Sequence, residues 1–160
     1  MPLVTSKEML LKAQKGGYAV GAFNAENMEM VKAIIQAAEE LKAPVMIQTT
    51  PSTIKYGTVE TYAAIVAAEA AKASVPVCLH LDHGSYDGCL KCVEAGFSSI
   101  MFDGSHYPIE ENIEKTTELV KLCHGKGLSI EAEVGSIGGE EDGVVGMGEC
   151  ADPKECKMIA

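Results

Sequence analysis

Apolar runs alternate with segments of helical periodicity along this chain of 160 residues. Apolar residues recur every three or four positions within residues 28–41, 59–70 and 109–125, which predicts helices with one buried face. The apolar runs between these helices are short and continuous, as is typical of strands that are covered on both faces. The pattern therefore predicts strands joined by crossover helices, and hence a parallel sheet.

The predicted strands are apolar runs that end in polar residues, and they cover residues 18–23, 44–50, 76–82, 98–104 and 129–135. The predicted helices cover a first segment from a cap at Thr5 or Ser6 to about residue 15, then 28–41, 59–70, 87–95 and 109–125, and a last helix begins at Asp152-Pro153. The glycine-rich stretch 136–150 is predicted to be a loop.

Two architectures fit this order of elements: an open doubly wound sheet and part of a (β/α)₈ TIM barrel. The chain has neither a GxGxxG nor a GxxxxGK[ST] motif, which disfavours the nucleotide-binding open sheets. Polar residues gather late in the predicted strands, and a barrel brings such positions together at one face. They are Asn24, Gln48, Thr49, Thr50, His80, Asp82, His83, Asp103, Glu131 and Glu133. A complete barrel has eight such units, so the five predicted strands would supply only part of one barrel domain over residues 1–160.

The amino-acid composition limits the classes of molecule that this chain can bind. The net charge is −10 and the chain has no arginine, which disfavours nucleic acid and anionic membranes as partners. Any phosphate must be bound by lysine, by backbone N–H groups or by groups outside this chain. No signal peptide or membrane-spanning run is predicted, so we expect a cytoplasmic protein with reduced thiols, in which the Cys89/Cys92 pair is structural.

The segment Leu79-His80-Leu81-Asp82-His83-Gly84 carries the strongest signal for chemistry. His80 and Asp82 share a strand face, and His83 lies where the strand ends. Three ionisable groups at the end of an apolar strand are costly unless they are paired or bind a metal. A satisfied polar strand end is the alternative, but the cluster favours a functional site with imidazole as a metal ligand and a carboxylate as proton carrier.

A second acidic signal lies near the last predicted strand. Glu131 and Glu133 are two residues apart, so they share a strand face, where a cation or a donor between them relieves their repulsion. The acids of Gly138-Gly139-Glu140-Glu141-Asp142-Gly143 follow closely, as a mobile catalytic loop or a solvated turn.

The segments LHLDHG and, some fifty residues later, EAEVGSIGGEED together resemble the signatures of the class II, metal-dependent ketose-bisphosphate aldolases. The segments AVGAFN, APVMIQTT and MFDGSH are similar to the family at matching places. The resemblance extends over essentially the whole chain but only over the N-terminal part of the family's fold. It implies a TIM barrel that cleaves fructose or tagatose 1,6-bisphosphate reversibly to glycerone phosphate and glyceraldehyde 3-phosphate through a zinc-stabilised enediolate.

The resemblance also implies roles for single residues. His83 matches a zinc ligand and Glu133 a carboxylate near the metal, with room for a second divalent or monovalent cation. Asp82 matches the acid/base at the hydroxyl next to the C–C bond that breaks, and Glu141 matches the loop carboxylate that moves the proton at the enediolate carbon. The positions that match residues near the substrate are Asn24, Gln48 and Thr50, and those that match less specifically are Asp103, Glu131 and Glu140. The family further implies a homodimer or homotetramer that acts on a phosphosugar.

Two zinc histidines and the phosphate-binding loops of the family have no counterpart in this chain. Because catalytic zinc usually has three protein ligands, we expect the natural protein to continue past Ala160 with further histidines at later strand ends. Two alternatives remain open at this stage: another metal-dependent phosphosugar lyase on the same scaffold, and an inactive half-barrel that acts only as an assembly module.

Overall fold

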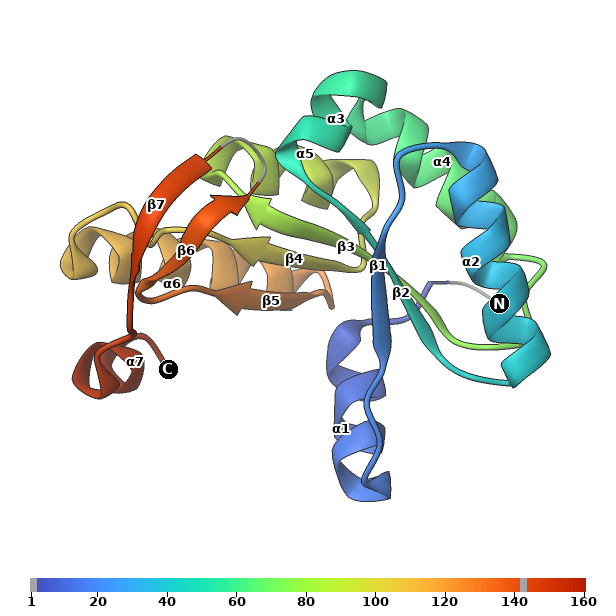
Figure 1. The fold of residues 1–160 in the computed structure, drawn as a ribbon, viewed down its shortest axis with the longest axis horizontal. Coiled ribbons are helices and arrows are strands. Elements are labelled where there is room, and N and C mark those ends of the chain that lie inside the picture. Colours follow the sequence, from blue (N-terminus) through green and yellow to red (C-terminus); the bar gives the residue numbers. More distant parts are fainter. Residues whose placement is uncertain (1–2, 142–143) are drawn as a thin grey trace.

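The computed structural model describes residues 3–141 and 144–160, with the side chains of residues 137–146 and 149 outside the description. Its centre is a sheet of five parallel strands in the order β1-β2-β3-β4-β5 (Figure 1). These strands are β1 (Gly21–Asn24), β2 (Val45–Thr49), β3 (Val77–Gly84), β4 (Ser99–Phe102) and β5 (Ser129–Ala132). Neighbours in the sequence are neighbours in the sheet, as in a barrel wall, and this confirms the predicted parallel α/β class.

The helices of the parallel unit are α1 (Ser6–Gly16), α2 (Met28–Leu41), α3 (Pro51–Gly57), α4 (Val59–Ala70), α5 (Tyr86–Ala95) and α6 (Ile109–Gly125). Side-chain caps fix where several of them begin. Asn27 Oδ1 accepts a hydrogen bond of 2.9 Å from Met30 N at the start of α2, and Ser85 Oγ accepts one of 3.2 Å from Gly88 N at the start of α5.

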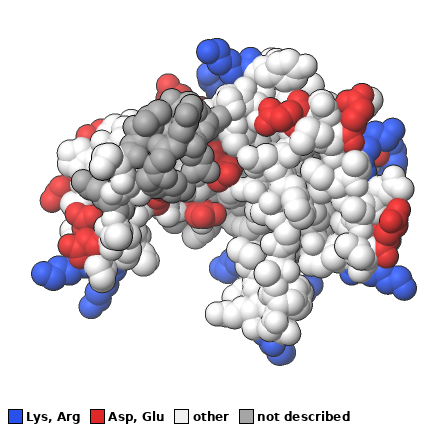
Figure 2. Space-filling view, viewed as in Figure 1, with Lys and Arg blue, Asp and Glu red and all other residues white. Residues whose placement is uncertain are grey.

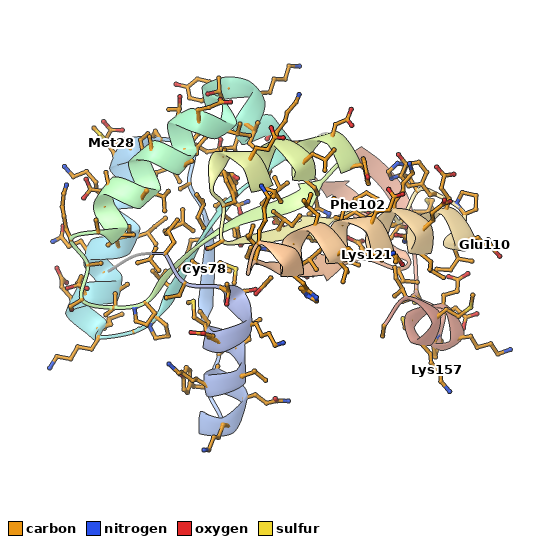
Figure 3. The ribbon with its side chains drawn as sticks, turned by 180° about the vertical axis from the view of Figure 1, so that it is seen from behind. Met28, Cys78, Phe102, Glu110, Lys121 and Lys157 are labelled. Atoms are coloured by element: carbon orange, nitrogen blue, oxygen red, sulfur yellow. The ribbon has the colours of Figure 1, made fainter. Side chains whose placement is uncertain are left out.

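The main core lies between the sheet and the helices on its convex side. Figure 3, seen from behind, shows α4, α5 and α6 across this side, with Phe102 labelled among them. Phe102 is fully buried, and its ring packs against Tyr86 at 6.2 Å and Tyr107 at 6.5 Å between ring centroids. This layer holds the crossover helices in place and so fixes the carboxyl ends of the strands.

The opposite, concave face of the sheet has a smaller core near the amino ends of the strands. Met46 and Cys78 are buried there against Met9 of α1, with Val4 and Val20 at the edge. Residues paired across parallel strands point to the same side of the sheet, and side chains alternate between the two faces along each strand. Every second residue after Met46 and Cys78 therefore also lies on the concave face. Those are the positions where the sequence places its polar groups.

The structure differs from the prediction at the glycine-rich stretch. Residues 136–150 were predicted to be a loop, but β6 (Ser136–Glu141) pairs antiparallel with β7 (Val144–Glu149) before α7 (Pro153–Ile159) (Figure 1). Glycines in both strands hide the strand pattern, because they lower β propensity without preventing pairing. The short helix α3 was also not predicted, although Thr50 as N-cap and Pro51 at the first helical position are its signal.

The buried stripe of α6 differs in part from the one that apolar periodicity predicts, which runs through Ile109, Ile113, Val120 and Cys123. Ile109, Ile113 and Val120 are only partly buried, whereas Asn112, Thr116 and Leu119 are buried together with Cys123. Two polar residues thus occupy the core-facing positions of this helix. Asn112 is buried there because it hydrogen-bonds to a residue of the site described below, and Thr116 hydrogen-bonds to Asn112.

Among the described residues, no helix is long and apolar enough to cross a membrane.

Candidate metal centre

Register across the sheet arranges the polar residues of the concave face in rows. Asn24 pairs with Gln48, Gln48 with His80, His80 with Ser99, and Ser99 with Ser129. This polar row lies one step above the apolar floor of Met46 and Cys78. Asp82, Glu131 and the residues that end β3, β4 and β5 lie above it, at the carboxyl edge where parallel α/β folds place their sites.

A bulge near the end of β3 directs His83 into this edge. The register between β3 and β4 shifts between Leu81 and Gly84, so β3 contains one residue more than its partner. His83 takes up the irregularity with φ = 49°, which is uncommon outside glycine. Such backbone geometry costs of order 1–3 kcal/mol and persists only where surrounding contacts hold it. Those contacts come from two carboxylates.

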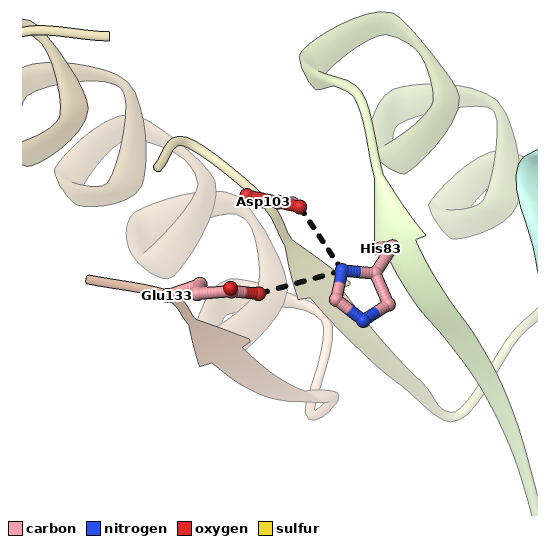
Figure 4. A group of neighbouring side chains, drawn as sticks. All are labelled: His83, Asp103 and Glu133. Carbon is pink, nitrogen blue, oxygen red and sulfur yellow. Dashed lines mark hydrogen bonds and ion pairs between the residues drawn. The ribbon is translucent and has the colours of Figure 1, made fainter. Parts of the chain in front are cut away.

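Asp103 directly follows β4 and Glu133 directly follows β5, and both carboxylates contact the His83 ring (Figure 4). His83 Nδ1 lies 3.0 Å from Asp103 Oδ2 and 3.4 Å from Glu133 Oε2. One ligand atom from each of the three residues lies within 4.8 Å of the others. All three side chains are partly buried, with 19%, 25% and 15% of their surfaces exposed.

The carboxylates of this cluster favour positive charge at the site, either on a protonated His83 ring or on a bound cation. Burial by itself would lower the pKa of His83, but the hydrogen bond with Asp103 and the charges of Asp82 and Glu133 raise it overall. Burial would raise the pKa of Asp103, but hydrogen bonds from Ser105 and His83 lower it overall. The site therefore attracts positive charge.

The donor set fits a divalent cation. One imidazole nitrogen and two carboxylate oxygens suit zinc, whose bonds of about 2 Å in tetrahedral geometry place ligand atoms about 3.3 Å apart. The observed separations of 3.0 and 3.4 Å bracket that value. In the face shown in Figure 2, most basic side chains lie near the outline of the molecule, whereas some acidic side chains lie nearer the middle.

Asn112 holds Glu133 in place from behind. Its Nδ2 donates a hydrogen bond of 2.9 Å to the Glu133 carbonyl, and its Oδ1 accepts one of 3.1 Å from Thr116 Oγ1. A Cβ at Gly104 would overlap the Asn112 side chain, so only glycine fits beneath it. Sequence reasoning missed Asn112; its signal was a polar residue at a core-facing helical position.

We predict that Asn112→Leu weakens zinc binding by about tenfold, the range found for groups that orient metal ligands. The leucine leaves the Glu133 carbonyl without its donor and lets the chain after β5 move. A competition titration with a chelating indicator measures the affinity. Thr117→Ala is the matched control, because its exposed hydroxyl bonds, within the part of the chain that the structure describes, only to the Ile113 carbonyl of the same helix, at 2.7 Å. Equal affinities for the two variants would remove Asn112 from this role.

His80 lies below the cluster and is 2% exposed. Burial, with a contribution from the charge of His83, lowers its pKa to about 4. Its Nδ1 is 2.8 Å from Ser99 Oγ, and its Nε2 is 3.8 Å from Glu131 Oε2. Glu131 keeps 62% of its side chain exposed on the concave side, yet partial burial and the charge of Asp82 raise its pKa.

The low pKa of His80 predicts that the folded chain loses stability in acid. The unfolded chain binds a proton at His80 near pH 6.5, whereas the folded chain does so near pH 4, so stability falls as the pH falls through that window. The full effect is about 3 kcal/mol, at about 1.4 kcal/mol per pKa unit. Urea unfolding of the metal-free chain at several pH values measures it. His80→Gln should flatten this dependence, whereas His106→Gln, at an exposed position, should leave it; identical slopes for wild type and His80→Gln would contradict the assignment.

The residues expected near the substrate are spread along the same face. Asn24 is exposed at the end of β1, and Gln48 is half-buried at the end of β2. Thr50 is buried, and its hydroxyl caps α3 through Thr53 N at 3.4 Å and bonds to Ser52 Oγ at 2.9 Å. The side chains of Glu140 and Glu141 lie outside the described residues, so their expected roles stay predictions.

A pocket of about 450 Å³ opens beside the cluster, between Met101, Glu131 and Glu133 on the sheet and Cys156 and Ile159 of α7. Its volume lies in the range of small-molecule sites. A larger pocket of about 660 Å³ lies between α1 and the edge of β5, and of the candidate residues it includes only Glu131. The smaller pocket is therefore the one that the chemistry favours.

Comparison with known proteins gives one consistent result. The sequence model of the family described as "Fructose-bisphosphate aldolase class-II" matches residues 4–160. A fructose-bisphosphate aldolase of Streptococcus pyogenes is 49% identical over 99% of this chain and 55% of its own length, and one of Mycoplasma pneumoniae is 47% identical over 99% and 56%. The crystal structure of the YdjI aldolase from Escherichia coli superimposes with a TM-score of 0.82 at 32% identity, over 98% of this chain and 56% of that one. The chain thus spans about half the length of the relatives it matches.

Proposed function

The chain belongs to the class II fructose-bisphosphate aldolase family, and from that membership we propose that the protein carrying it cleaves a ketose 1,6-bisphosphate, fructose 1,6-bisphosphate first, in a metal-dependent aldol reaction. The observation that carries the proposal is the convergence of His83, Asp103 and Glu133 at the carboxyl ends of three neighbouring strands. The fold alone supports many chemistries, so the argument rests on this site.

We propose zinc as the metal, held through His83, Asp103 and Glu133, whose ligand atoms lie together at the site. A bound divalent cation supplies positive charge that stabilises the carbanion left when the C–C bond breaks. The carboxylates around the cluster complement the positive charge of such a cation.

Proton transfer is assigned to two carboxylates. Asp82 precedes the metal-binding histidine and removes the proton of the hydroxyl at the carbon that becomes the aldehyde. The C–C bond then breaks, and its electron pair stays on the ketone fragment. Glu141 gives a proton to that carbon to complete glycerone phosphate. Asn24, Gln48 and Thr50 border the path of the substrate at the ends of β1 and β2.

The proposal is tested by assaying the purified protein with fructose and tagatose 1,6-bisphosphates in parallel. Formation of glycerone phosphate is followed by coupled reduction with NADH. We expect cleavage of fructose bisphosphate, with a lower kcat/KM for the tagatose isomer. The opposite order would make it a tagatose-bisphosphate aldolase, and no turnover of either with zinc bound would contradict the proposal and favour the assembly module.

The same membership supports a glycolytic, cytoplasmic enzyme that acts as a homodimer or homotetramer, and we propose these properties with it. Sedimentation of the purified protein measures the assembly state directly.

A further inference from the structure

The polar row beneath the metal cluster is unusual for the interior of a barrel wall. Barrel interiors are filled mainly by bulky branched apolar side chains. Here His80, Ser99 and Ser129 occupy consecutive strands and are 2%, 1% and 8% exposed. A buried imidazole is costly unless it is hydrogen-bonded, so the geometry of its partners shows what the row does.

A chain of hydrogen bonds runs from the first helix to this histidine. Ser6 Oγ at the start of α1 lies 2.9 Å from Ser99 Oγ, which lies 2.8 Å from His80 Nδ1. On the other side of the ring, His80 Nε2 faces Glu131 Oε2 at 3.8 Å. Lys7 N donates to Ser129 Oγ at 3.0 Å, so the first turn of α1 is bonded to two members of the row.

The charge on Glu131 decides the direction of these bonds. If Nδ1 carried the proton, the lone pair of Nε2 would face a carboxylate, which is repulsive. With the proton on Nε2, that N–H points toward the carboxylate, Nδ1 accepts from the Ser99 hydroxyl, and Ser99 accepts from Ser6. The Ser99 hydroxyl then donates once, to His80, and accepts once, from Ser6. The low pKa of the buried imidazole is consistent with a neutral ring, for which this choice between tautomers exists.

We propose that His80 is a positioning residue: the Ser6–Ser99 hydroxyl chain fixes its proton on Nε2, and this N–H faces the Glu131 carboxylate at 3.8 Å and orients it electrostatically beside the metal cluster. Glu131 is two residues before Glu133 on the same strand end, so its orientation sets how the acidic edge faces the substrate. The effect on turnover rests on the proposed aldolase function, whereas the tautomer does not.

The tautomer is measured by ¹⁵N-¹H correlation spectra of the histidine ring in the purified protein, in the wild type and in Ser99→Ala. We expect a single Nε2–H tautomer for His80 in the wild type and a mixture in Ser99→Ala. An Nδ1–H tautomer in the wild type, or an unchanged tautomer in Ser99→Ala, overturns the proposal whether or not the protein is an aldolase.

The kinetic test compares adjacent serines. Ser99→Ala should lower kcat for bisphosphate cleavage by about 10- to 100-fold with KM nearly unchanged, and Ser6→Ala should lower it less. Ser99→Thr keeps the hydroxyl and should restore most of the loss. The matched control is Ser98→Ala, because Ser98 Oγ bonds to Leu79 N at 3.0 Å and to Leu79 O at 3.3 Å and not to the histidine.

The serine variants distinguish a purely structural role of the polar row from a positioning role of His80. Equal losses of kcat in Ser98→Ala and Ser99→Ala, in proportion to their losses of unfolding free energy, would show a merely structural row and overturn the proposal. Absence of cleavage in the wild type would overturn the proposed function instead, and the spectra would then decide the tautomer on their own.

Discussion

Removal of divalent metal is expected to abolish bisphosphate cleavage by the protein that carries this chain, and zinc is expected to restore it. The reason is that cleavage leaves a carbanion next to a carbonyl, and an enzyme stabilises it either with a metal or with a Schiff base on lysine. The chelated enzyme should fall to background turnover in the coupled assay.

The lysines of the chain argue against the second route. A Schiff-base lysine must be desolvated to be nucleophilic at neutral pH. All thirteen lysines lie among the described residues, in helices or loops, and none of them is buried. Borohydride added with substrate should therefore leave the activity intact. A lysine of the chain covalently trapped with substrate, found by mass spectrometry, would contradict the metal-dependent account.

Asp82→Ala should lower the rate of C–C cleavage by about 10²-fold or more, while zinc stays bound. Asp82 is assigned to the proton of the hydroxyl, and its carboxylate is not in the cluster of His83, Asp103 and Glu133. Glu141→Ala should mainly slow the exchange of the glycerone phosphate proton with solvent, because it is assigned to the other carbon. Steady-state cleavage and deuterium exchange followed by NMR separate the two steps.

Zinc content measured on both variants is the control for the metal site. If Asp82→Ala and Glu141→Ala both kept near-wild-type rates for cleavage and exchange, neither residue would carry the assigned proton transfer. If Asp82→Ala lost its zinc together with its activity, Asp82 would be a ligand and not the base.

The parallel sheet and its polar edge could be predicted because each depends on local pattern. Continuous apolar runs such as residues 76–82 are enough to predict buried strands, and the helices between them require parallel neighbours. His83 and Glu133 lie at the carboxyl ends of β3 and β5, on either side of β4, so the topology brings them to the same edge of the sheet. The resemblance to the aldolases adds an expectation that topology does not contain, namely the metal and the reaction.

The finer geometry depends on contacts that sequence periodicity does not report. The bulge that gives His83 its positive φ appears only when the register of β3 against β4 is known. Asn112 and Ser99 look like ordinary polar residues in the sequence, and their meaning comes from the Glu133 carbonyl and the His80 ring that they contact. Asp103 was a weaker candidate, yet it makes the shortest contact to His83 in the cluster.

The most direct test of the account is a zinc titration of the purified, metal-free protein and two histidine variants by competition with a chelating indicator. Wild type and His106→Ala, which changes an exposed histidine just beyond β4, should bind zinc with the same affinity. His83→Ala should bind at least about tenfold more weakly, because it removes the one imidazole of the cluster. Equal zinc affinity in wild type and His83→Ala would contradict the claim that the ends of β3, β4 and β5 form a metal centre.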